Sequence, residues 1–130
     1  MESGTQRLQV ALFIIEQIDS VPQLEALLLL FNSRPKGWSI ETMAKSLYVR
    51  SDMAARILDS LLQRKLIAVD SHRPDVFFYA SEDDYQNRLM EAVDAVYRKE
   101  VVRVSSLIHS KGSAGVRDFA RPFRIKRDKG

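Results

Sequence analysis

The sequence has 130 residues, a length that suits one compact domain, or one domain with an added helix and tail. Hydrophobic residues make up 45% of the chain and charged residues 28%, a balance typical of folded proteins and not of disordered ones. The chain contains no cysteine. Disulfides, thiolate metal sites and cysteine nucleophiles are therefore excluded.

The first residues lack the cationic and apolar segments of a secretory signal. The longest uninterrupted apolar runs, one of them from Ala26 to Phe31, are too short to cross a bilayer. We therefore expect a cytoplasmic protein without a membrane segment.

Positive charge is concentrated at the C-terminus. The 20 Lys and Arg exceed the 17 Asp and Glu by three, but residues 111–130 alone carry seven basic and two acidic residues. Residues 1–110 consequently have a net charge of −2. Within them, residues 34–80 are basic, with eight Lys or Arg against five Asp or Glu. The basicity thus favours contact with nucleic acid in two places.

Helical periodicity begins near the N-terminus. Apolar residues at a spacing of three and four predict an amphipathic helix over 7–18. A second helix is predicted over 21–31, with Ser20 as its N-cap and Pro22 in its first turn. This helix is apolar on nearly every side, so we expect it at the centre of the core.

Two further helices with a short gap between them follow the loop around Pro35. Ser39 is the expected N-cap of the first, and Ser51 that of the second. In the second helix we expect Met53, Ile57 and Leu61 to point inward. Only three or four residues separate the two helices, which is typical of a helix-turn-helix.

The remaining pattern predicts a hairpin and a long helix. The β-prone runs 66–69 and 76–79 are joined by a loop that contains Pro74. Helical periodicity then continues from Ser81 to about His109. The predicted fold is mainly α with a small β-hairpin: a winged helix-turn-helix with a flanking N-terminal helix and a long C-terminal helix.

Residues 21–80 resemble the winged helix-turn-helix superfamily, in particular the bacterial multiple-antibiotic-resistance-type (MarR-like) transcriptional regulators. The segments that carry the resemblance are WSIETMAKSLYV as the supporting helix, SDMAARILDSLLQRKLI as the recognition helix with its exit, and VFFYA as the second wing strand. The whole chain also resembles small uncharacterised bacterial winged-helix proteins with a basic FAxxFR-type tail, here FARPFRIKRD.

The resemblance implies a transcriptional regulator that binds double-stranded DNA. In such proteins the recognition helix enters the major groove and the wing contacts the flanking backbone. Transferred to this sequence, Arg56 and Gln63 would contact bases, with Ala55 and Ser60 at the margins of the same face. Arg50 and Ser51 would bind phosphate at the helix N-terminus, and His72 and Arg73 would do so from the wing tip.

Two carboxylates on the same face favour an alternative. Asp52 and Asp59 lie four residues before and three residues after Arg56, spacings that allow ion pairs within the helix. They would also repel phosphates. The alternative function is a winged-helix adaptor that binds another protein and has no sequence-specific DNA binding.

Catalysis, metal binding and cofactor binding are not indicated. His72 and His109 lack neighbouring ligands at metal-binding spacing, and no phosphate-binding glycine loop or GxSxG motif occurs among the five glycines. We expect a protein that is not an enzyme and has no catalytic residues, metal or cofactor.

Three parts are expected: residues 1–80 as the winged-helix domain with its N-terminal helix, 81–110 as the long helix, and 111–130 as a basic tail. The apolar surface of the long helix exceeds what a small domain can cover, which predicts a homodimer formed through 7–18 and 81–109. Tail cations are expected to contact DNA phosphates or a partner; they are Arg117, Arg121, Arg124, Lys126 and Arg127.

Overall fold

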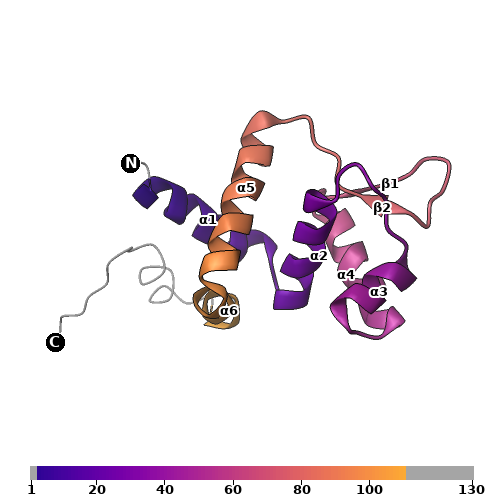
Figure 1. Ribbon diagram of the computed structural model, residues 1–130, viewed down its shortest axis with the longest axis horizontal. Helices are drawn as coiled ribbons and strands as arrows, with labels where there is room; N and C mark the ends of the chain where they lie inside the picture. Colours follow the sequence, from indigo (N-terminus) through magenta and orange to yellow (C-terminus); the bar gives the residue numbers. More distant parts are fainter. Residues whose placement is uncertain (1–2, 111–130) are drawn as a thin grey trace. The chain divides into compact units, whose positions relative to one another are not determined.

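The computed structural model describes residues 3–110, which contain six helices and one two-stranded antiparallel hairpin (Figure 1). The chain divides into two compact units. The central unit is Ser20–Asn87, and the flanking unit combines Met1–Asp19 with Arg88–Gly130. The N-terminal helix therefore groups with the C-terminal helices, which differs from the expected division at residue 80.

Helix α2 (Val21–Asn32) lies at the centre of the central unit. As predicted, Ser20 is its N-cap, and the Ser20 Oγ accepts a hydrogen bond from the Gln23 backbone N at 3.2 Å. Leu24, Leu27 and Leu30 are fully buried. Because α2 is apolar on nearly every side, α3 and α4 both pack against it.

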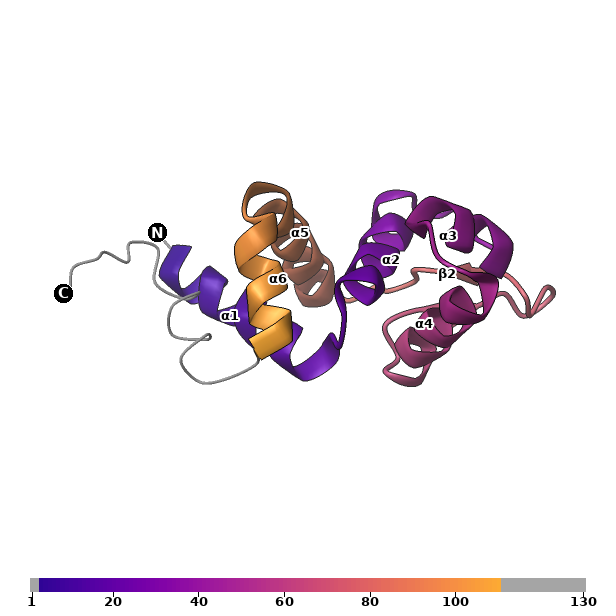
Figure 2. The ribbon, with the colours of Figure 1, turned by 90° about the horizontal axis from the view of Figure 1, so that it is seen from below.

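Helix α3 (Ile40–Leu47) begins at a capping box, in which Ser39 and Thr42 each bond the other's backbone N. The predicted N-cap is thus confirmed. Helix α3 buries Met43 and Ala44 and packs against α4, the next helix along the chain (Figure 2). Residues 48–50 separate the two helices, as a helix-turn-helix requires.

Helix α4 (Ser51–Gln63) differs from the prediction in two details. Its N-cap is Arg50, not Ser51, and the Arg50 side chain makes no capping hydrogen bond, whereas the Asp52 Oδ1 accepts one from the Met53 N at 2.9 Å. Met53, expected inside, is 41% exposed, and Ala54 is buried in its place. The buried stripe consists of Ala54, Ile57, Leu58 and Leu61. This stripe faces the core, where α4 packs against α2 and α3.

The predicted hairpin is present and short. Strand β1 (Ala68–Val69) pairs antiparallel with β2 (Phe77–Phe78), with Ala68 opposite Phe78. Trp38 extends this pairing, because its backbone N and O exchange hydrogen bonds with Phe77 at 2.7 and 2.8 Å. Trp38 itself is buried. The segment before α3 thus fixes the base of the hairpin.

Helix α5 (Asp84–Lys99) starts in the central unit, three residues later than predicted. Tyr79 holds its first turn, because the Tyr79 hydroxyl donates to the Asn87 Oδ1 at 2.8 Å and the Asn87 Nδ2 donates to the Ser81 O at 3.1 Å. Burial raises the pKa of Tyr79 above its usual value. The hydroxyl therefore stays protonated as a donor at neutral pH.

The described part of the flanking unit is formed by α1 (Ser3–Gln17), most of α5, and α6 (Val101–Ser110). Helix α1 contains the predicted helix 7–18 almost entirely and packs against α6. The apolar side chains buried in this unit include Val10, Ile14, Met90, Val93, Val104 and Leu107.

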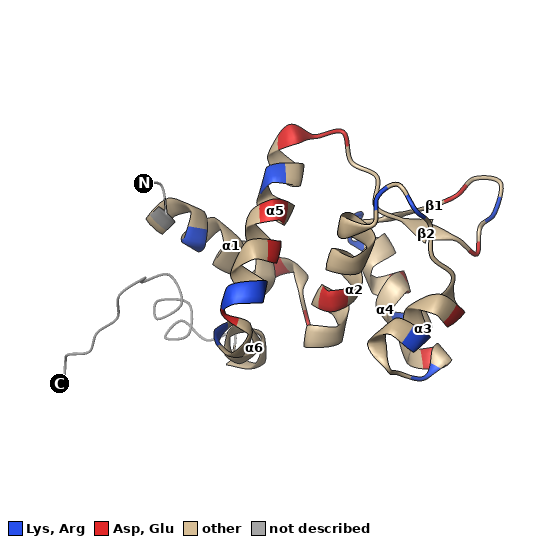
Figure 3. Ribbon diagram, in the orientation of Figure 1, with Lys and Arg blue, Asp and Glu red and all other residues tan. Residues whose placement is uncertain are grey.

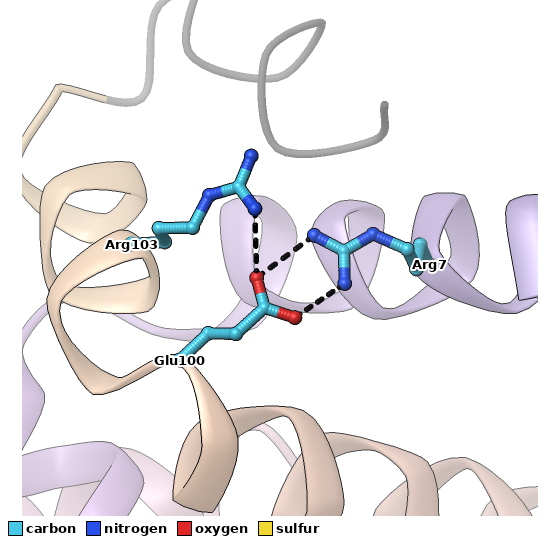
Figure 4. A network of polar contacts seen from close by, with 3 residues as sticks. All are labelled: Arg7, Glu100 and Arg103. Atoms are coloured by element: carbon cyan, nitrogen blue, oxygen red, sulfur yellow. Dashed lines mark hydrogen bonds and ion pairs between the residues drawn. The ribbon is translucent and has the colours of Figure 1, made fainter. Parts of the chain in front are cut away.

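The C-terminal helix is not continuous. We expected one helix over 81–109, and the structure has two, α5 and α6, which meet at Glu100 (Figure 4). The Glu100 carboxylate accepts hydrogen bonds from Arg7 Nη1 at 2.6 Å and Nη2 at 3.0 Å, and Arg103 Nη1 bonds the same carboxylate at 3.1 Å. Because the helix breaks here, the Glu100 carboxylate can bond Arg7 of α1. Helix α6 still packs against α1.

The Arg7–Glu100 pair lies in a largely desolvated position, with side-chain exposures of 12% and 18%. The hydrogen bonds from Arg7 hold the pKa of Glu100 below its usual value of 4.5, despite the opposing effect of burial. A lowered pKa in the folded state means that the pair stabilises the fold above pH 4.5. This contribution is lost as the pH falls through the lowered pKa.

We therefore expect Glu100→Gln to lower the free energy of unfolding at pH 7 by about 2 kcal/mol, because the Arg7 charge loses its partner. Urea denaturation at a series of pH values measures this. The difference between wild type and variant should shrink toward low pH, where wild-type Glu100 is itself protonated.

Glu91, which is exposed on α5, provides the matched control. Glu91→Gln removes the same charge and should change the free energy of unfolding little at any pH. A Glu100→Gln variant as stable as wild type at pH 7 would show that the pair does not hold α1 to the α5–α6 junction.

Candidate nucleic-acid interface

The outer face of α4 is polar. Because the buried stripe seats α4 on α2 and α3, the opposite face is left exposed; it presents Asp52, Met53, Arg56, Asp59 and Gln63. Arg56 and Gln63 therefore lie on the predicted face. Ala55 is partly exposed at its margin, also as predicted.

Ser60 is directed toward α2 instead of outward. Its hydroxyl donates to the Ile57 O at 2.8 Å and accepts from the Gln23 Nε2 at 2.7 Å. Gln23 is the buried polar residue of α2, with 2% exposure. Ser60 thus satisfies a buried amide, and we do not include it in the interface proposed below.

The N-terminus of α4 brings two cations to one carboxylate. The Arg50 Nε lies 3.4 Å from the Asp52 Oδ1, and the Arg56 Nη1 lies 3.9 Å from the Asp52 Oδ2. All three side chains are more than half exposed. Exposed pairs of this kind contribute about 1 kcal/mol or less, so they restrain the arginines only weakly.

The second carboxylate of this face contacts Gln63. The Gln63 Nε2 donates to the Asp59 Oδ2 at 2.8 Å, one turn along the helix. The sequence spacing also allowed a pair between Asp59 and Arg56, and in the structure Arg56 pairs with Asp52. A base contact by Gln63 must therefore displace a hydrogen bond on the protein surface.

The loop between β1 and β2 is ordered by Asp70. Its Oδ1 accepts hydrogen bonds from the backbone N of His72 at 2.8 Å and of Arg73 at 3.2 Å. Val76 N donates to the Arg73 O at 2.9 Å and closes the turn. His72 and Arg73, both exposed at the tip, are thus held by the loop's own hydrogen bonds.

Gly37 allows the hairpin to approach the segment before α3. A Cβ at position 37 would lie 2.3 Å from the Val76 Cγ1, so a side chain there requires the hairpin to shift. Lys36 lies close by, with its Nζ 4.9 Å from the centre of the Trp38 ring. The backbone pairing of Trp38 with Phe77 depends on this close approach.

Charge of both signs is distributed over this surface (Figure 3). Helix α3 carries Glu41 and Lys45, and the hairpin loop has both acidic and basic residues. The net charge of +3 over residues 34–80 is thus a sum over mixed positions, not a continuous basic stripe.

Tyr48, in the turn between α3 and α4, was not singled out by the sequence pattern. It is 94% exposed and adopts the left-handed conformation, with φ of 59°. The signal that could have identified it is the short turn without glycine, which forces another residue into this conformation.

The predicted tail cations Arg117, Arg121, Arg124, Lys126 and Arg127 lie outside the described residues. Within residues 3–110, no group of three or more His, Asp or Glu residues is arranged to hold a metal ion. None of the helices in that range is both long and apolar enough to span a membrane.

Comparison with solved structures supports the fold. The chain is similar to MepR, a transcription regulator of the Staphylococcus aureus multidrug efflux pump MepA, with 19% identity and a TM-score of 0.52 over 87% of this chain and 80% of that chain. The fold is a winged helix. The winged helix predicted from residues 21–80 is thus confirmed, with α3 and α4 as the helix-turn-helix and β1–β2 as the wing.

A second solved structure is CouR from Rhodococcus jostii RHA1 bound to p-coumaroyl-CoA, with 16% identity and a TM-score of 0.46 over 95% of this chain and 89% of that chain. No protein-family model and no curated protein sequence matches the chain.

Proposed function

We propose that this chain is a homodimeric DNA-binding transcriptional regulator of bacterial type, and not an enzyme. The observation that carries the proposal is the exposed polar face of α4, seated on α2 and α3 beside a wing that is fixed by Trp38. A winged helix that serves a transcription regulator, MepR, supports the same function here. In this role the protein acts through binding energy and needs no catalytic group.

Helix α4 enters the major groove with its N-terminus toward the backbone. Arg56 bonds a guanine edge and Gln63 a second base, with Ala55 close to a thymine methyl group. Arg50 and the first turn at Ser51 contact phosphates, because the N-cap residue Arg50 makes no side-chain capping bond and only the Met53 N of this turn bonds a side chain, the Asp52 Oδ1 at 2.9 Å. His72 and Arg73 contact the backbone from the wing.

The carboxylates of α4 do not prevent this binding. A bidentate contact of Arg56 with guanine discriminates against the wrong base by about 1–3 kcal/mol. The exposed ion pair with Asp52, which must be exchanged for that contact, is worth about 1 kcal/mol or less. The exchange is therefore favourable, and Asp52 lowers affinity without abolishing it.

Two changes one helical turn apart should have opposite effects. Arg56→Ala should weaken binding to the preferred sequence about 10- to 100-fold, because it removes a base contact. Asp52→Asn should strengthen binding, because it releases Arg50 and Arg56 and removes repulsion of phosphate. Fluorescence anisotropy with duplexes enriched by the protein from a genomic library, at several salt concentrations, measures both.

Glu41→Gln is the matched control for Asp52→Asn, since it removes one exposed carboxylate from the first turn of α3 instead of α4. Its effect should be smaller. Absence of DNA binding by the wild-type protein even at low salt would contradict the proposal and favour the protein-binding adaptor.

The flanking unit is proposed as the dimer interface. Apolar side chains remain exposed on α1 and α6; they are Leu8 and Leu12, each 43% exposed, and Val101 and Val102, 44% and 77% exposed. Leu8 and Leu12 are one helical turn apart and form a stripe that a second copy can cover. Two winged helices would then address two half-sites.

Light scattering of the full chain at micromolar concentration should give the mass of a dimer, and Val102→Glu should shift it toward the monomer because a charge would be buried at the interface. Ser46→Glu, at an exposed position of α3 outside the flanking unit, is the control and should leave the mass unchanged. A wild-type monomer whose mass does not depend on concentration would exclude the proposed dimer.

The basic tail is proposed to add phosphate contacts. A chain truncated after Gly115 lacks the five tail cations named above, so its affinity for DNA should fall. The dependence of log K on log salt should also become shallower, by about 0.9 for each phosphate that the tail would otherwise neutralise. Anisotropy titrations of both chains over a series of salt concentrations give the two slopes. An unchanged slope would assign the tail to another role.

A further inference from the structure

Tyr48 combines backbone strain with almost complete exposure. Its φ of 59° and ψ of 44° lie in the left-handed region, which non-glycine residues adopt at a cost. The turn requires this conformation, because Val49 N donates to the Ala44 O at 3.0 Å to close the end of α3. Glycine would make the same turn without the strain.

Packing within the chain does not compensate for this strain. The residue is 94% exposed, so its ring buries very little surface. Lys65 is strained and exposed in the same way, but its side chain is a cation that water solvates well. The Tyr48 ring is an apolar surface left in water at a strained position, which suggests a contact outside the chain. Its surroundings indicate what kind of contact this is, since exposed Lys45 and Arg50 lie on either side of it in the sequence. An aromatic hydroxyl between two cations suits an anionic backbone.

We propose that Tyr48 is a DNA-backbone contact: its ring packs on a deoxyribose and its hydroxyl donates a hydrogen bond to a phosphate oxygen beside the groove that α4 occupies. The inference rests on the proposed function and adds a neutral contact to the charged ones. Since the backbone is the same at every base pair, the contact contributes to binding of any sequence.

Two variants test the proposal from two sides. Tyr48→Phe keeps the ring and loses the hydroxyl, and it should weaken binding about fivefold, both to the enriched duplex and to random-sequence duplexes of about 30 bp. The salt slope should not change, because a phenol displaces no counterion. Tyr48→Gly should weaken binding further while raising the midpoint of thermal unfolding by about 3 °C.

Lys65 provides a matched control for strain. It occupies the same kind of turn at the other end of α4, with φ of 63° and a hydrogen bond from Leu66 N to the Leu61 O at 3.0 Å. Lys65→Gly should therefore also raise the midpoint, with an affinity within about twofold of wild type. Tyr85→Phe removes an exposed hydroxyl from α5 and should leave affinity unchanged.

The outcomes separate this inference from the proposed function. If wild type binds DNA and both Tyr48 variants bind as tightly, the Tyr48 contact is refuted and the regulator proposal stands. If Tyr48→Phe weakens binding only to the enriched duplex, Tyr48 contacts a base and the backbone contact is wrong. If wild type binds no duplex at low salt, both proposals are overturned.

Discussion

Helix α2 determines how the polar face of α4 is presented. Its apolar side chains must be covered on several sides, so α3 and α4 pack against it, and the rotation of α4 follows from which residues it can bury there. The hydrogen bond between Gln23 and Ser60 fixes this rotation further, because a buried amide without a partner is costly. The polar face of α4 is what remains, and the proposed DNA contacts lie on it.

Much of this arrangement could be predicted from the sequence. Ser20 and Ser39 cap their helices as predicted because N-capping is a local interaction between neighbouring residues. The rotation of α4 could be predicted only in part: Ile57 and Leu61 are buried, whereas Met53 is exposed and Ala54 buried. Helical periodicity does not decide between the two positions, because Met53 is four residues before Ile57 and Ala54 four residues before Leu58, and both of those are buried.

Two structural features were not predicted, one because it depends on a distant residue and one because it depends on the geometry of a short turn. Glu100 interrupts the C-terminal helix, and its partner Arg7 lies 93 positions away. The left-handed turn at Tyr48 follows from the short connection between α3 and α4, not from a glycine. For the candidate interface, the sequence alone predicted which residues of α4 and of the wing tip would contact DNA. The bonds between Asp52 and its two arginines depend on side-chain geometry, although their spacing suggested one of them.

On the proposed function, the face of α4 and the wing contact a DNA duplex. Hydrogen exchange of the full chain, with and without a saturating duplex enriched by the protein, shows whether they do. We predict slower exchange on binding for amides of residues 48–56 and of the wing loop 70–76, with no such change in α2, whose side chains are buried in the core of the central unit. Protection confined to α1 and α6, or none at saturation, would contradict it.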